Sequence, residues 1–171
     1  MSLTERAFTA TAQDFSITQM TEHDLLEVVE IEETTGLSRW GWAAYYSELQ
    51  GHHNHLMLVA RVDGAERQDH RHRLAGYIVA RLGADELHIN NVAVRNKYRG
   101  RGIGLKLLNS ILTQGARSGA ARAYLELRAG NSAALALYEK CGFQVTARRA
   151  RYYSEPTEDA LVMTVHLQGN A

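Results

Sequence analysis

A strand, a basic glycine-rich turn and the start of an amphipathic helix follow one another over residues 86–108, and this segment constrains the fold most. The turn contains Gly100, Gly102 and Gly104, so several backbone N–H groups lie where no bulky side chain hinders a ligand. The first amides of a helix have no acceptor within that helix and attract anions. Two arginines in the turn add positive charge. The segment therefore predicts a turn that binds a phosphate or pyrophosphate group.

Two common phosphate-binding motifs do not fit this turn. A Walker loop ends in Gly-Lys followed by Ser or Thr, whereas Gly104 is followed by Leu105 and Lys106. A Rossmann turn places three glycines at the start of a parallel strand-helix-strand unit, and here Arg99 leads the pattern instead. A plain strand-to-helix turn without a ligand also fits, but glycines inside a helix cost about 1 kcal/mol each, which favours an anion-binding role.

Residues 92–104 resemble the acetyl-CoA-binding motif of the GNAT superfamily of N-acetyltransferases, Arg/Gln-x-x-Gly-x-Gly/Ala. Arg99, Gly102 and Gly104 occupy the positions of that motif. A second stretch, residues 124–143, is similar to the second half of the RimI branch, the ribosomal-protein-alanine N-acetyltransferases. The resemblance implies an α/β GNAT fold, with a mixed, mostly antiparallel central sheet of about seven strands flanked by about four helices.

The composition is that of one folded domain, with 171 residues of which 45% are hydrophobic and 22% charged. We expect a tail over residues 1–12 and a single N-acetyltransferase domain over residues 13–171. Basic and acidic side chains number 19 each, so the net charge of +0 favours neither nucleic acid nor a membrane surface. Cys141 is the single cysteine, which excludes an internal disulfide and a cysteine-rich metal site. We therefore expect a cytoplasmic protein without a metal, a nucleic-acid partner or a membrane span; its oligomeric state is left open.

Apolar periodicity and helix-capping residues predict the order of the elements. The expected strands cover residues 15–20, 56–62, 74–82, 87–94, 121–127, 143–152 and 160–167. The expected helices run from Thr21 to Gly36, from Ser38 to Gly51, from the glycine-rich turn to Gly119, and from Asn131 to Gly142.

Two groups of side chains allow more than one interpretation. Trp40, Trp42 and Tyr45 on the second expected helix fit either a packed core or the border of an acceptor groove near residues 34–42. The five histidines between residues 52 and 72 do not form a closed ligand set, so we expect solvated loop side chains rather than a metal site.

The resemblance assigns the binding of acetyl-CoA to the end of a strand, the turn after it and one later asparagine. The strand and the turn would hold the pantetheine and the pyrophosphate through backbone groups, and the asparagine would contact the pantetheine arm. These residues are Val92, Ala93, Val94, Arg99, Gly100, Arg101, Gly102, Ile103, Gly104, Leu105 and Asn131.

Acetyl transfer to an amine also needs a proton acceptor and a proton donor. Glu126 lies in an apolar strand, where partial burial would favour proton uptake, although alternation alone would also allow a solvated glutamate. The RimI-like pattern has its proton-accepting glutamate at this position. At Tyr138 it has the tyrosine that protonates the departing CoA, although such a helix tyrosine could also fill core. His88 fits either a packed strand residue or the histidine with which related N-terminal acetyltransferases hold a water between amine and base.

We therefore predict an acetyl-CoA-dependent N-acetyltransferase that acts on the α-amine of a protein or peptide N-terminus, with a ribosomal-protein alanine among the candidates. Two alternatives stay open: a GNAT acetyltransferase of a small amine such as a polyamine, drug or metabolite, and a non-enzymatic acyl-CoA-binding sensor domain. The loop over residues 63–73 and the extended N-terminus depart from the RimI pattern and leave the ribosomal acceptor open. A sensor would need the turn but not Glu126 and Tyr138.

Overall fold

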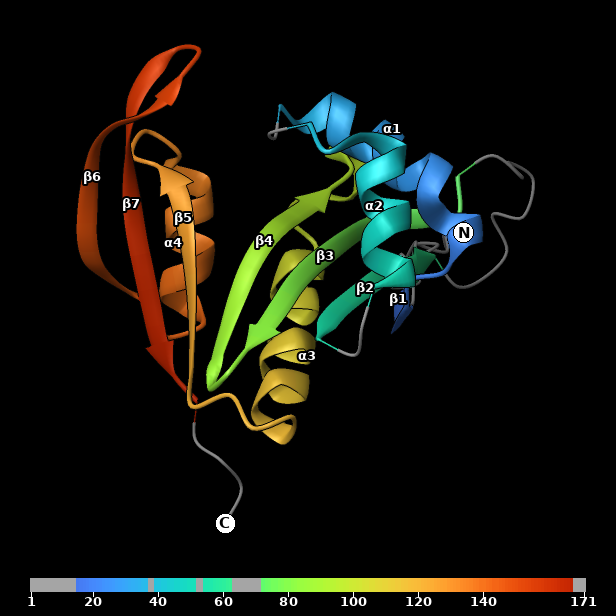
Figure 1. Cartoon of the computed structure of the whole chain (residues 1–171). Coiled ribbons are helices and arrows are strands. Elements are labelled where there is room, and N and C mark those ends of the chain that lie inside the picture. Colours follow the sequence, from blue (N-terminus) through green and yellow to red (C-terminus); the bar gives the residue numbers. More distant parts are fainter. Residues whose placement is uncertain (1–14, 37–38, 52–53, 63–71, 168–171) are drawn as a thin grey trace, which may run out of the picture.

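The structure is a computed structural model that describes residues 15–36, 39–51, 54–62 and 72–167. Its strands are β1 (Phe15–Gln19), β2 (His55–Val62), β3 (Leu74–Gly83), β4 (Glu86–Val94), β5 (Arg122–Arg128), β6 (Gln144–Ser154) and β7 (Thr157–His166). Its helices are α1 (Leu25–Thr35), α2 (Gly41–Gln50), α3 (Ile103–Arg117) and α4 (Ser132–Lys140). The strands form one sheet in the order β1-β2-β3-β4-β5-β7-β6, with α1 and α2 on one face and α3 and α4 on the other (Figure 1). The expected α/β fold with a mixed, mostly antiparallel sheet is confirmed.

Some expectations fall on residues outside the described ones, namely the tail over residues 1–12, Ser38 as a helix cap and most of the loop over residues 63–73. The first helix begins later than expected. A short 3-10 turn (Glu22–Asp24) precedes it, because the backbone N–H of Thr21 donates to Asp24 Oδ2 at 2.8 Å and closes a local capping turn.

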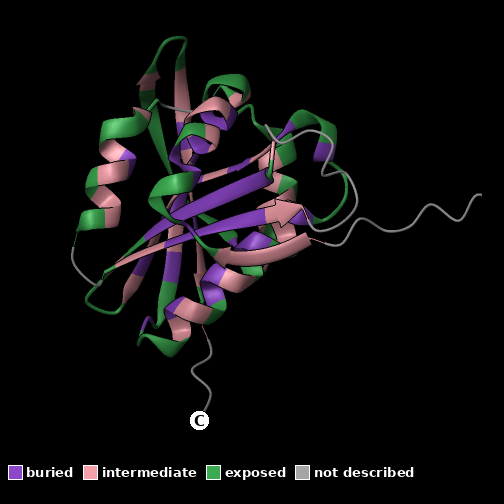
Figure 2. Ribbon diagram, turned by 90° about the vertical axis from the view of Figure 1, so that its right-hand side faces the viewer, coloured by how far each residue is buried: buried purple, intermediate pink, exposed green. Residues whose placement is uncertain are grey.

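Two apolar clusters hold the helices on the sheet. Helix α3 buries Leu107, Leu108 and Ile111 against one face, and α1 buries Val28 and Ile31 against the other. Residues three and four apart share one side of a helix, so each helix presents a single apolar stripe. Figure 2 shows the result, a sheet whose central strands are buried while the surfaces around them are exposed.

The sheet divides at its centre. Strands β4 and β5 are parallel and pair over only three residues, from Glu86 with Arg122 to His88 with Tyr124. Beyond that point they diverge (Figure 1). After His88, the edge of β4 that faces β5 is therefore not paired with β5.

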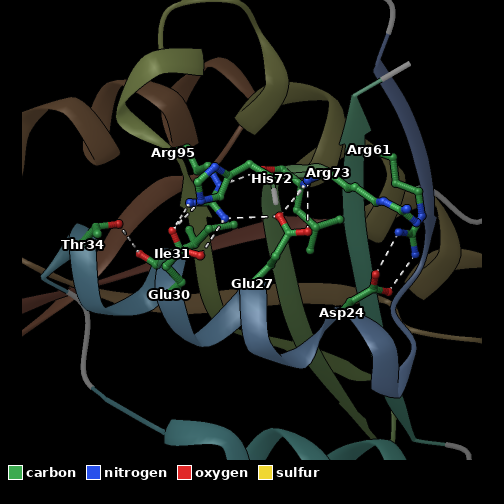
Figure 3. Close-up of polar contacts among 10 residues, drawn as sticks. Asp24, Glu27, Glu30, Ile31, Thr34, Arg61, His72, Arg73 and Arg95 are labelled. Carbon is green, nitrogen blue, oxygen red and sulfur yellow. Dashed lines mark hydrogen bonds and ion pairs between the residues drawn. The ribbon is translucent and has the colours of Figure 1, made fainter. Parts of the chain in front are cut away.

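Acidic residues tie α1 to the strands behind it (Figure 3). Asp24 accepts hydrogen bonds of 2.8 and 2.7 Å from the guanidinium of Arg61 on β2. Burial opposes ionisation of Asp24, but the hydrogen bonds from Arg61 and Thr21 outweigh it and hold the pKa of that carboxyl below its usual range. Arg95, directly after β4, binds Glu30 at 2.9 Å and also reaches Glu27 on α1. These contacts fix the end of β4, and with it the glycine-rich turn, relative to α1.

Arg95→Leu is expected to lower the free energy of unfolding by roughly 2–4 kcal/mol, less than for a fully buried pair because Glu30 is half-exposed. The loss arises because Arg95 is only 9% exposed and its removal takes the guanidinium away from the carboxylates of Glu27 and Glu30. Urea unfolding at pH 7 measures it. The control is Arg122→Gln, which removes an exposed ion pair with Glu86 and should cost less than about 1 kcal/mol. Equal losses in the two variants would contradict the role given to Arg95.

Candidate active site

A groove of about 550 Å³ opens between the end of β4, the turn after it and one side of α4. It is lined by all the residues expected to bind acetyl-CoA except Arg101, whose guanidinium lies 5.5 Å from the centre of the Tyr98 ring. The lining is Thr35, Val92, Ala93, Val94, Tyr98, Arg99, Gly100, Gly102, Ile103, Gly104, Leu105, Asn131, Ala133, Ala134, Leu137 and Lys140.

The glycine-rich turn presents unobstructed backbone amides to this groove. Gly100 and Gly102 have φ angles of 74° and 77°, in the left-handed region that favours glycine, and nothing lies within 4 Å of where a Cβ would stand. The amide of Lys106 donates to the carbonyl of Gly102 at 3.0 Å, so the amides of residues 103–105 precede the first hydrogen bond of α3. Amides in this position carry the positive end of the helix dipole, which fits a phosphate or pyrophosphate.

The edge of β4 supplies the other wall of the groove. Val92, Ala93 and Val94 line it beyond the three residue pairs that join β4 to β5. The Val94 carbonyl accepts a hydrogen bond of 3.2 Å from Arg99 Nε. An extended chain with amide groups, such as the pantetheine arm of CoA, can hydrogen-bond to a strand edge of this kind. Turn and edge together therefore fit CoA.

A polar pair lies where β4 and β5 separate. His88 Nε2 is 2.9 Å from Glu126 Oε2. Glu126 follows Tyr124 by two residues, and Tyr124 is the β5 partner of His88, so all three side chains share one face of the sheet. The ring of Tyr124 stacks on His88 with centroids 4.5 Å apart. Glu126 is 15% exposed, so the carboxylate is largely shielded from water but can still be reached.

The contacts of His88 are compatible with one neutral tautomer. An ionised carboxylate can only accept, so His88 Nε2 must carry the proton that points at Glu126. On the other side of the ring, the amide nitrogen of Asn90 is 3.3 Å from Nδ1 and can only donate. The neutral ring with its proton on Nε2 satisfies both contacts. His88 therefore orients the carboxylate of Glu126 as a hydrogen-bond donor.

A bulge in β4 places Asn90 beside His88. Ile89 pairs with Ala80 and Asn91 with Val79, so Asn90 stands opposite no residue of β3. Before the bulge Ile89 packs beneath α3, whereas after it Asn91 donates to the Tyr45 hydroxyl beneath α2. The extra residue thus changes which face the following side chains reach, as bulges beside active sites commonly do.

Residues 23–143 match the acetyltransferase (GNAT) family. The chain belongs to this family. It is 37% identical over 161 residues to the N-alpha-acetyltransferase RimI of Mycobacterium tuberculosis, covering 91% of this chain and 94% of that protein. It is 33% identical to a putative ribosomal protein bS18-alanine N-acetyltransferase of Bacillus subtilis, covering 88% and 94%. The crystal structure of the ribosomal-protein-S18-alanine N-acetyltransferase from Escherichia coli superposes with a TM-score of 0.78 at 26% identity, covering 92% and 97%.

This GNAT protein is an N-acetyltransferase, and membership of the family implies acetyl-CoA as the acetyl donor. The sequence resemblance to the RimI branch is thereby confirmed. The individual residues assigned to binding and to proton transfer are placed by the structure but stay predictions.

Tyr138 is the site residue that the GNAT structure places least favourably for chemistry. It does not line the groove, and its ring packs 5.9 Å from that of Phe143. Among the described residues its hydroxyl has no hydrogen-bond partner. Burial, with smaller contributions from Tyr153 and Cys141, raises the pKa of Tyr138 to about 12. The hydroxyl therefore keeps its proton at any physiological pH.

Several groove residues of this GNAT domain were missed by sequence reasoning. Ala133, Ala134, Leu137 and Lys140 come from one side of α4. The last three follow Ala133 by one, four and seven residues, a spacing that places side chains on one face of a helix. Helix periodicity could therefore have indicated these residues. Asn131, which was expected at the site, also caps α4, since its Oδ1 accepts from the amide of Ala134 at 3.1 Å.

The aromatic residues of α2 differ in burial. Tyr45 is fully buried and donates to Glu32 Oε1 at 2.8 Å, so it belongs to the core. Trp42 is 45% exposed. Glu32, which is itself buried, also accepts the backbone amides of Trp40 and Gly41 at 2.7 and 3.0 Å. This buried carboxylate fixes the start of α2 against the end of α1.

The expectation of solvated loop histidines is wrong for His55, which lies on β2 with Nδ1 against a carboxylate oxygen of Glu48. His72 lies in the segment before β3 and is partly exposed, with Nε2 2.9 Å from Glu30 Oε1. Both are held by carboxylates of the helices packed against them. The described part of the chain contains no group of three or more metal-ligating side chains. No helix within it is both long and apolar enough to cross a membrane.

Proposed function

We propose that this acetyltransferase transfers the acetyl group of acetyl-CoA to the α-amine of a protein N-terminus, with the N-terminal alanine of ribosomal protein bS18 as its acceptor. The observation that carries the proposal is the Glu126–His88 pair at the divergence of β4 and β5, in which His88 lies on the same strand as the groove residues Val92 and Val94. Relatives named for this acceptor span 88% of the chain and support it.

The turn and the strand edge would hold acetyl-CoA. The amides of residues 103–105 would bind the pyrophosphate, and the edge of β4 at Val92 and Val94 would bind the pantetheine arm, with Asn131 beside it. When bound, acetyl-CoA supplies an activated acetyl thioester. Arg99 would add positive charge at the phosphate end.

Glu126 would accept the proton of the acceptor. An N-terminal α-amine has a reference pKa of about 7.7–8.0, so near neutral pH it is mostly charged and must lose a proton before it can attack. Glu126 can receive that proton while His88 keeps its carboxylate oriented. Tyr138 would return a proton to the departing thiolate.

A set of three acceptors tests the proposal. Thiol release is measured with a peptide of the bS18 N-terminal sequence beginning with alanine, with the same peptide acetylated at its α-amine, and with a polyamine. Turnover with the free peptide alone is expected. Turnover with the blocked peptide would mean transfer to a side chain, and faster turnover with the polyamine would favour the small-amine alternative.

Tyr138→Phe should lower kcat by roughly 10²-fold or less if the hydroxyl donates the proton, since a CoA thiol leaves partly unaided. Because the pKa of Tyr138 is raised to about 12, the wild type should show no alkaline loss of kcat from this group near pH 10. Steady-state kinetics measure the loss of proton donation by the hydroxyl, and a thermal melt measures any loss of core packing. Wild-type turnover in the variant would leave Tyr138 as a core residue.

A further inference from the structure

The carboxylate of Glu126 is held from two sides. His88 lies against Oε2, and Arg149 of β6 places Nη1 3.5 Å from the other oxygen, Oε1. Arg149 is 51% exposed, whereas Glu126 is 15% exposed. The guanidinium therefore covers the oxygen of the carboxylate that His88 does not occupy.

We propose that Arg149 is a positioning residue, which fixes the carboxylate of Glu126 and favours the neutral form of the acceptor amine beside it. This inference rests on the proposed role of Glu126 as the proton acceptor. It assigns to β6, at the edge of the sheet, a part in setting the pH range of the reaction.

The sheet geometry brings Arg149 to Glu126 across a whole strand. Strand β7 lies between β5 and β6, and its residue Ala160 is the partner of both Arg149 and Arg128. Cross-strand partners share a face, and Glu126 lies two residues from Arg128, so the side chains of Arg149 and Glu126 are on the same face.

A strained bulge begins at Arg149. Regular pairing of β6 with β7 stops there and resumes at Tyr153, with Asp159 alone facing the residues between. Within the bulge Arg151 has a φ of 52°, an unfavourable conformation for a side chain larger than glycine. Asp159 stabilises it, because Oδ1 accepts the Arg151 amide at 2.9 Å and Oδ2 accepts Arg148 Nε at 2.7 Å. Strain supported in this way at the edge of a site is typical of a positioning device.

The groups that face Glu126 come from three strands. They are His88 from β4, Tyr124 from β5, and Arg149 and Tyr153 from β6. Burial raises the pKa of Tyr124 and of Tyr153, so both are neutral near pH 7. His88 is a cation only when both of its ring nitrogens carry a proton. Arg128 lies on the same face two residues from Glu126, but it is paired with Glu158 at 3.2 Å. Arg149 is therefore the permanent cation that contacts Glu126.

A permanent positive charge beside Glu126 acts on the acceptor. It disfavours the ammonium form of an α-amine bound near Glu126. This effect extends the reaction toward lower pH. Loss of the charge should therefore move the acid limb of the kcat profile, which reports ionisation in the enzyme–substrate complex, to higher pH.

The test is Arg149→Gln, assayed with the alanine-initiated peptide at saturating acetyl-CoA. We expect kcat to fall by roughly 10-fold to 10²-fold and the KM for acetyl-CoA to stay unchanged, since misplacing a catalytic group by about 1 Å can cost 10²-fold. The acid limb should move up by roughly 0.5–1 pH unit, less than for a buried pair because the guanidinium is half-exposed. Arg149→Lys should restore the position of the limb.

The matched control is Arg151→Gln, which removes the same charge from the same strand. Arg151 is exposed, and the hydrogen bond described for it is donated by its backbone amide, which the substitution keeps. Its pH profile should be that of the wild type. An equal shift in this control, or an unchanged profile in Arg149→Gln, would overturn the inference. If one of these results is found and Glu126→Gln still lowers kcat, the role of Glu126 as proton acceptor stands. If Glu126→Gln is fully active, the roles proposed for Glu126 and for Arg149 are both wrong.

Discussion

Glu126→Gln is expected to lower kcat by at least roughly 10²-fold while the affinity for acetyl-CoA stays nearly constant. Glutamine keeps the size of the side chain but cannot accept a proton. It can still take a hydrogen bond from His88 Nε2, which at present donates across 2.9 Å, so the loss would reflect chemistry rather than collapse of the site. Single-turnover kinetics together with calorimetric titration of acetyl-CoA separate the two quantities.

The control for this substitution is Glu86→Gln, at the start of the same β4–β5 pairing. Glu86 forms an exposed ion pair with Arg122, and its neutralisation should leave kcat within about twofold of the wild type. If the rate of Glu126→Gln at neutral pH is close to that of the wild type, Glu126 is a scaffold residue. His88 or a water relay would then be the better candidate for the base.

Gly102→Val is expected to raise the dissociation constant of acetyl-CoA by roughly 10²-fold, because a branched side chain would stand between the pyrophosphate and the amides of the turn. In the protein alone nothing lies within 4 Å of the new Cβ, so a steric clash with the fold is not the cause of the loss. The φ of 77° adds backbone strain, which lowers stability as well. Calorimetry measures the affinity, and a thermal melt measures the stability.

Gly119→Val serves as the matched control for that strain. Gly119 follows α3, has a φ of 97° and also has open space around its Cβ position, but it lies outside the groove. A comparable loss of stability with unchanged affinity for acetyl-CoA is expected. Unchanged affinity in Gly102→Val itself would refute the assignment of the turn as the anion site.

The parts of the site that could be predicted from the sequence are those encoded locally. The strand, turn and helix at residues 86–108 are adjacent in the chain, so glycine spacing and helix-start chemistry suffice to describe them. Asn131 could be predicted as a helix cap for the same reason. Glu126 and Tyr138 were found through the resemblance to the RimI branch, because strand alternation and helix periodicity alone left their roles open.

The contacts that the sequence could not indicate join residues far apart in the chain. Arg149 meets Glu126 across an intervening strand, and only the sheet order places them together. The bulge at Asn90 is invisible to alternation, because the buried positions alternate evenly through it while the faces exchange. Glu32, a charged residue on the amphipathic helix α1, would be expected at the surface. It is buried because groups at the start of α2 and on α2 hydrogen-bond to its carboxylate.

The short pairing of β4 with β5 makes the site a junction between two half-sheets. They meet at the pairs from Glu86–Arg122 to His88–Tyr124, and the side chains of His88 and Glu126 lie at that junction. The proton acceptor and its orienting histidine therefore belong to different half-sheets, and the few backbone hydrogen bonds of this pairing set the distance between them.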